Sequence, residues 1–161
     1  CGVKTNIVTA VEIGDGYCND SPYLAPMVEE TAKNFTMKEV SADMAYPSLK
    51  NFQAIVDAGA TPYIPFPVNK TGKQGGLWEK LFHYFSFNRE EFLTHYHKRS
   101  NVESTFSMIK RKFGDHLRSK TDTAITNESL LKVLCHNICC LIHAFFELGI
   151  KLDLLGNEMI C

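Results

Sequence analysis

Apolar side chains recur every three or four residues in the stretch HYHKRSNVESTFSMIKRKFG, residues 95–114. These are Val102, Phe106, Ile109 and Phe113, and no helix-breaking residue occurs before Gly114. Side chains at this spacing share one face of a helix. The stretch therefore predicts an amphipathic helix that packs its apolar face against the rest of the molecule.

The polar residues of the same stretch predict a second face with its own chemistry. Tyr96, Arg99, Glu103 and Lys110 are separated by three, four and seven residues, so successive turns bring them onto one stripe. Here a carboxylate can hold a divalent metal ion while the two cations bind phosphate oxygens on either side of it. The alternative is a solvated face that is stabilised only by pairs of opposite charge.

The remaining apolar runs predict strands that alternate with helices. The expected strands are residues 3–13, 37–42 and 61–66, and Asp43 directly follows the second one. The expected helices are one capped by Asp20 or Ser21 that runs through Ala32, and then residues 48–57, 77–85, 90–97 and 127–148. This order is typical of an α/β fold in which helices cover a sheet.

The composition is that of a globular domain. The chain has 161 residues, of which 45% are hydrophobic and 22% are charged, enough for one domain with a core. Residue 1 is Cys and the opening residues already predict a strand, so we interpret residues 1–161 as part of a longer domain. The uncharged run 133–146 is too short to cross a bilayer and contains two histidines, so we expect no membrane segment.

The net charge of −1 hides an uneven distribution. Residues 96–120 hold seven Lys or Arg against two acids, a net charge of +5, and the rest of the chain is acidic. A local basic stretch favours binding to a phosphate backbone, because affinity grows with the number of phosphates that are neutralised. The alternative is again a solvated face.

The six cysteines do not have the spacing of a disulfide framework, which favours reduced thiols in a cytosolic protein. The cluster Cys135, His136, Cys139, Cys140 and His143 could suggest a zinc site. Large apolar residues surround the cluster, and cysteine is readily buried, so we favour packing in the core. Trp78 is the only tryptophan, and we favour a core or interface position for it over base stacking.

The order and spacing of Tyr96, Arg99, Glu103 and Lys110 resemble the YREK signature of bacterial insertion-sequence transposases with a DDE catalytic site. Residues 40–66, VSADMAYPSLKNFQAIVDAGATPYIPF, are similar to the segment of this family that carries the second catalytic Asp, and Asp43 is the match. Residues 3–13 resemble the strand just after the one with the first Asp. The stretch NESLLKVLCHNICCLI resembles the family's closing segment.

The resemblance implies an α/β, ribonuclease H-like mixed sheet flanked by helices, with N-terminal strands missing and a helical C-terminal part. It implies that Asp43 and Glu103 are catalytic ligands of two Mg²⁺ or Mn²⁺ ions, which activate an attacking water or 3′-hydroxyl and stabilise the leaving oxygen. Double-stranded DNA would be the partner, with Arg99 and Lys110 on phosphates and Tyr96 against the backbone. Arg111 and Lys112 extend this DNA-binding set. A homo-oligomer is allowed, and the expected location is the bacterial cytoplasm at the nucleoid.

The chain departs from the family in two places. The first Asp should lie upstream of residue 3, so we expect that this chain alone does not cut DNA. Only residues 67–95 separate the strands from the signature helix, a short and mostly helical insertion, of which residues 67–76 predict a flexible linker. The alternatives are a non-catalytic DNA-binding remnant that acts as an inhibitor, and a structural module without either activity. The leading hypothesis, a transposase catalytic domain, requires that Asp43 and Glu103 lie close together in space.

Overall fold

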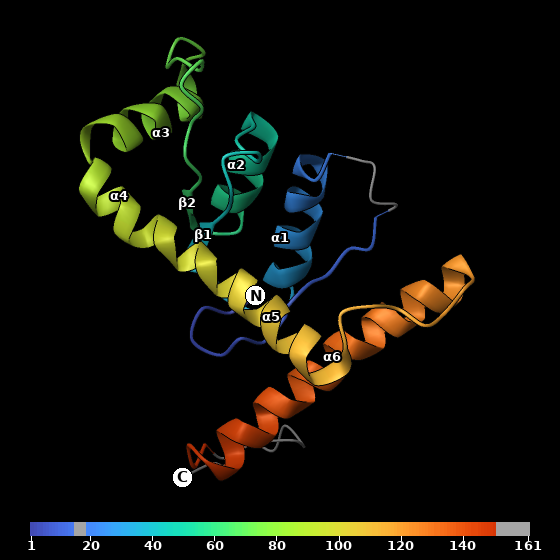
Figure 1. Cartoon of the computed structure of the whole chain (residues 1–161). Coiled ribbons are helices and arrows are strands. Elements are labelled where there is room, and N and C mark those ends of the chain that lie inside the picture. The colour runs from blue at the N-terminus through green and yellow to red at the C-terminus, as the bar shows by residue number, and fades with distance from the viewer. Residues whose placement is uncertain (15–18, 151–161) are drawn as a thin grey trace.

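Two short strands, β1 (Glu39–Ser41) and β2 (Thr61–Tyr63), pair in parallel and form the centre of the fold (Figure 1). The computed structural model describes residues 1–14 and 19–150. Helix α2 (Leu49–Asp57) connects the two strands, as parallel pairing requires, and the register places Glu39 opposite Thr61. Both strands and α2 confirm the sequence prediction for this segment.

Local capping explains where α2 begins. The Ser48 side chain accepts a hydrogen bond from the Asn51 backbone N–H, which satisfies one of the free donors of the first turn. The buried Asn51 amide in turn donates to the backbone oxygens of Ser21 and Tyr46 at 3.0 and 2.8 Å. The bond to Ser21 ties α2 to the short 3-10 helix η1 (Ser21–Tyr23). Helix α1 (Leu24–Ala32) follows η1 and packs beside α2. Asp20, at the N-cap position of η1, makes no side-chain cap hydrogen bond.

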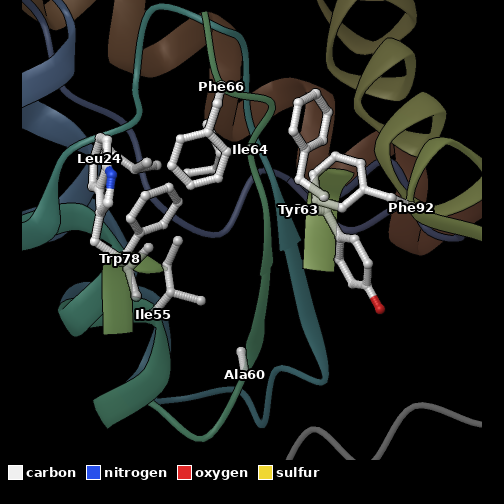
Figure 2. Packing of buried hydrophobic residues seen from close by; sticks show 11 residues of the cluster. Leu24, Ile55, Ala60, Tyr63, Ile64, Phe66, Trp78 and Phe92 are labelled. Carbon is white, nitrogen blue, oxygen red and sulfur yellow. The ribbon is translucent and has the colours of Figure 1, made fainter. Parts of the chain in front are cut away.

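The core is rich in aromatic side chains and lies on both sides of β2. Figure 2 shows Leu24, Ile55 and Trp78 on one side of this strand, with Tyr63 and Phe92 on the other. Trp78 is 3% exposed, and its indole N–H donates to the Thr71 carbonyl at 2.8 Å, which confirms the expected core position. Helices α3 (Gly76–Phe87) and α4 (Arg89–Tyr96) supply Trp78 and Phe92 to this core.

The predicted single helix over residues 95–114 is divided in the structure. His95 and Tyr96 end α4, a 3-10 turn η2 (His97–Arg99) follows, and α5 (Ser100–Phe113) begins after it. The Ser100 hydroxyl donates to the His97 carbonyl at 2.9 Å, a local bond that competes with regular helix geometry. The three elements still follow one another along nearly one line, from the end of α3 past the sheet to α6 (Figure 1).

The predicted strand over residues 3–13 is wrong, because these residues form no strand in the structure. A strand needs a hydrogen-bonded neighbour, and Val8 is instead bonded by a side chain. The Asn137 amide accepts from the Val8 N–H at 2.9 Å and donates to the Val8 carbonyl at 2.8 Å. Asn6 adopts a positive φ of 56°, which suits a turn rather than a strand. The expected mixed sheet is therefore a two-stranded parallel sheet in the described part of the chain.

The last described helix, α6 (Asp122–Phe146), begins five residues before the predicted start at residue 127. Thr121 is its N-cap, and the Thr121 side chain accepts a hydrogen bond from the Ala124 N–H. Glu128 accepts hydrogen bonds from the Ser119 and Arg118 N–H groups, which lowers its pKa to about 2 and ties the preceding loop to the helix. Helix α6 contacts α5, and His136 is its one buried residue.

By length and composition alone, α6 is also apolar enough to cross a membrane, with a mean hydropathy of 1.6. It is the one such helix in the described residues, and a single helix of this kind is weak evidence for a membrane segment. The sequence-based expectation of no membrane segment therefore stays a prediction.

Candidate functional site

Asp43 and Glu103 meet at the guanidinium group of Arg99. Asp43 lies two residues after the end of β1, Arg99 is the last residue of η2, and Glu103 is in the first turn of α5. The Arg99 Nη1 atom lies 3.6 Å from Asp43 Oδ2 and 3.0 Å from Glu103 Oε1. The two carboxylate oxygens are therefore no further apart than the sum of these two distances. Side chains sixty positions apart in the sequence thus come together around one cation.

Tyr96 holds the other edge of the same guanidinium group. Arg99 Nε donates to the Tyr96 hydroxyl at 3.0 Å, and the guanidinium carbon lies 5.6 Å from the centre of the Tyr96 ring. The hydrogen bond with Tyr96 is the largest cause that raises the pKa of Arg99, and the charges of Asp43 and Glu103 raise it further. The guanidinium is therefore always positively charged, and the hydrogen bond to Tyr96 holds its Nε side in place.

The two carboxylates are open to solvent. The side chains of Asp43 and Glu103 are 49% and 64% exposed, whereas that of Arg99 is 29% exposed. Asp43 also accepts a hydrogen bond from the Met44 N–H through Oδ1, which leaves Oδ2 directed at Arg99. Exposed oxygen donors of this kind suit a hard divalent cation that retains water ligands.

A second group of charged residues fixes β1 to the turn that carries Arg99. Glu39 of β1 pairs with His95 through one carboxylate oxygen and with Lys98 through the other. Burial raises the pKa of Glu39, but the hydrogen bonds from Lys98 and His95 outweigh burial and lower it. His95 also stacks on Tyr63 of β2, with ring centres 4.4 Å apart and planes 7° apart.

This clamp of Glu39, His95 and Lys98 was missed in the sequence. The Ser41 hydroxyl strengthens it by donating to the His95 carbonyl at 3.1 Å. A signal existed, because an acid within a predicted strand can pair with a histidine and a lysine three positions apart on a predicted helix. The clamp positions Arg99 and Glu103 beside Asp43.

Lys110, Arg111 and Lys112 lie in the last turn of α5, and all three are exposed. Lys110 is seven residues after Glu103, so it shares that face about 10 Å further along the helix. Arg111 and Lys112 are rotated by about 100° and 200° from Lys110, so the three cations do not form one row. None of them makes an ion pair within residues 1–14 and 19–150.

The predicted core position of the cysteine and histidine cluster of α6 is confirmed for His136 alone. Cys135, Cys139 and Cys140 are half-buried, and the His143 side chain is 56% exposed. His136 is fully buried and donates from Nε2 to the Asn6 carbonyl at 2.9 Å, as expected of a core residue. The Cys140 sulfur lies 3.4 Å from the same nitrogen, and burial raises the pKa of this thiol. Among the described residues, no three His, Cys, Asp or Glu side chains are arranged to hold a metal ion.

The model of one protein family, described as "Transposase DDE domain", matches residues 1–138. The chain belongs to the transposase DDE domain family. No curated protein and no solved structure matches it. Transposases of this family move DNA, so DNA is the substrate class that membership implies. The α/β model with a small parallel sheet is consistent with a DDE domain, and the matched range includes both carboxylates and Arg99.

Proposed function

We propose that this transposase domain takes part in phosphodiester hydrolysis and strand transfer at transposon ends, with Asp43 and Glu103 as ligands of Mg²⁺ or Mn²⁺. The observation that carries the proposal is the convergence of the two carboxylates on Arg99 Nη1, at 3.6 and 3.0 Å. We further propose that the chain belongs to the YREK-signature group, through Tyr96, Arg99, Glu103 and Lys110.

The donor set fits a hard divalent cation. Both groups are carboxylates, and their side chains are 49% and 64% exposed. Because only two protein ligands converge here from separate elements, coordination positions of the ion stay open for water and substrate. A single guanidinium group supplies one positive charge to two negative ones, so the pair retains a net negative charge that favours a further cation.

When bound, two divalent ions would supply a more nucleophilic attacking oxygen and a stabilised leaving oxygen. In this proposal, Asp43 and Glu103 would be ligands of the ions, and Arg99 and Lys110 bind phosphate oxygens of the DNA. Tyr96 orients the guanidinium through its hydroxyl. The clamp of Glu39, His95 and Lys98 keeps the turn of Arg99 against β1.

A third carboxylate is needed for the full ligand set of the family, and no third His, Cys, Asp or Glu joins the pair in the described residues. We therefore propose that the chain supplies two of three carboxylates and does not cut DNA by itself.

Mn²⁺ titration by calorimetry, together with a nicking assay on supercoiled plasmid, tests the proposal. We expect weak Mn²⁺ binding that is lost in Asp43→Asn and in Glu103→Gln. The matched control is Glu29→Gln, which removes an exposed acid of α1 and should leave binding unchanged. Equal Mn²⁺ binding in all four proteins would overturn the metal assignment. Mg²⁺-dependent nicking that disappears in Glu103→Ala would overturn the claim of inactivity.

The second candidate is a DNA-binding remnant without catalysis, favoured by the same absence of a third ligand among the described residues. It predicts DNA binding that weakens steeply with salt, because the basic stretch 96–120 releases counterions from phosphates. It also predicts that Mn²⁺ binding does not depend on Asp43 or Glu103. Salt-dependent DNA binding without carboxylate-dependent metal binding would therefore favour this candidate.

A further inference from the structure

Arg99 occupies the space that a shared metal ion needs. Its Nη1 atom is within 3.6 Å of Asp43 and 3.0 Å of Glu103, so a positive group already lies between the two carboxylates. Any cation that binds both carboxylates together takes the place of this nitrogen. The proposed metal site and the observed position of Arg99 are therefore mutually exclusive arrangements of the same residues.

The attachments of Arg99 differ in strength. The contact with Asp43 is long, and the pair with Glu103 is an exposed i,i+4 pair, a type of interaction that contributes little in water. The Nε edge is better held, because Tyr96 accepts its hydrogen at 3.0 Å and offers its ring face at 5.6 Å. The Nη1 end can therefore leave the carboxylates while Tyr96 keeps the guanidinium at the site.

The charges of the site favour the replacement of Arg99 by a divalent cation at the two carboxylates. In the structure, two carboxylates are paired with one guanidinium, which leaves the group with a net negative charge. This charge repels a DNA phosphate. A bound divalent cation neutralises both carboxylates and leaves the guanidinium without an anionic partner, and a guanidinium binds phosphate well through its fork of N–H donors.

We propose that Arg99 is an internal counter-ion of the site: it holds Asp43 and Glu103 together until a divalent cation displaces it, and it then binds a DNA phosphate. This inference rests on the proposed function, because it requires that Asp43 and Glu103 bind metal. It makes metal binding and DNA binding mutually strengthening, since each ligand favours the same displaced position of Arg99.

The first test is calorimetric titration of the whole chain with Mn²⁺. Arg99→Gln removes the competing charge and should bind Mn²⁺ about 2- to 5-fold more tightly than wild type, the factor that an exposed ion pair corresponds to. Arg118→Gln is the matched control, because it removes the same charge from an exposed side chain that forms no ion pair with Asp43 or Glu103 in the described part of the chain, where both carboxylates pair with Arg99. It should change the affinity much less, and circular dichroism verifies that both variants fold.

The second test is binding of a fluorescent DNA duplex, with and without Mg²⁺, at constant ionic strength. Mg²⁺ should tighten DNA binding to the wild-type chain by about 5-fold, a typical value for coupled sites. This effect should disappear in Arg99→Gln and also in the double variant Asp43→Asn/Glu103→Gln. Arg118→Gln removes a charge of the basic stretch 96–120 and can weaken DNA binding as a whole, but it should retain the tightening by Mg²⁺.

The outcomes separate the two proposals. If the carboxylate variants lose Mn²⁺ binding but Arg99→Gln binds Mn²⁺ no more tightly than Arg118→Gln, the metal site stands and the role of Arg99 is overturned. A weaker affinity in Arg99→Gln overturns it as well, because Arg99 would then organise the site rather than compete for it. If the carboxylate variants bind Mn²⁺ like wild type, both proposals fail.

Discussion

The core around β2 and the helix α6 are both rich in apolar residues, yet they differ in how these residues are used. Phe52 and Phe92 of the core are 1% and 2% exposed, whereas Leu131 and Phe146 of α6 are 58% and 75% exposed. The core receives side chains from both faces of a strand, and α6 packs mainly on α5 and the N-terminal segment. An apolar sequence is therefore buried only where other elements supply matching surfaces.

The largest expected effect comes from breaking the core at Phe52. Its ring lies 5.3 Å from that of Phe66 and 5.6 Å from that of Trp78, so Phe52→Ala opens a cavity among aromatic groups. We expect the free energy of unfolding to fall by about 3–5 kcal/mol, as measured by urea denaturation. A loss below about 1 kcal/mol would show that the site collapses without cost.

A smaller effect is expected at the contact between α6 and the N-terminal segment. Asn137→Ala removes both hydrogen bonds to Val8 and leaves a half-buried N–H and carbonyl without partners. We expect a loss of about 1–2 kcal/mol and faster hydrogen exchange at the Val8 amide. Asn137→Asp retains the acceptor for the Val8 N–H and should protect that amide better than Asn137→Ala does. Equal exchange in the three proteins would contradict the bonding described.

The clamp between the core and the site should make stability depend on pH. The pKa of Glu39 is lowered from 4.5 in the folded chain, so folding favours its ionised form. This contribution is fully present above the unfolded pKa and is lost as the pH falls through the folded pKa. We expect Glu39→Gln to lose about 1 kcal/mol at pH ~7 and almost nothing at a pH below the folded pKa of Glu39, where the wild-type carboxylate is protonated too. The variant Glu29→Gln should show no such difference between the two pH values.

The smallest effect is expected on the exposed face of α6. Leu131 is more than half exposed, so Leu131→Ala removes little buried surface, and alanine favours the helix. We expect the free energy of unfolding to change by no more than about 0.5 kcal/mol in urea denaturation. A loss comparable to that of Phe52→Ala would mean that this face is covered in solution, and the contrast between the two regions would then be wrong.

The segments that sequence analysis predicted well carry their own local signals. Ser48 caps α2, Gly59 follows its end with a φ of 76°, and β1 delivers Asp43 at its C-terminal end. These signals act over a few residues, so they are visible without the rest of the fold. Their success explains why the two strands and the helix between them were predicted together.

The failures occurred where distant residues decide the local structure. Residues 3–13 have strand-forming side chains but are bonded by Asn137, more than 120 positions later. The pairing of Glu39 with His95 and Lys98 also depends on the fold. The convergence of Asp43 and Glu103 was expected from the family resemblance and not from their spacing. Their roles in metal binding, like those of Tyr96, Lys110, Arg111 and Lys112 with DNA, stay predictions.

The stacking of His95 on Tyr63 has a practical consequence for anyone who engineers this chain. Tyr63 belongs to the core, and His95 lies in the last turn of α4, the helix that leads into the turn with Arg99. We therefore expect a substitution that displaces the Tyr63 ring to move that turn and to change the distance between Asp43 and Glu103. Redesign of the interior for solubility or expression should therefore keep Tyr63 and His95 unchanged, since we expect the geometry of the site to change before the protein unfolds.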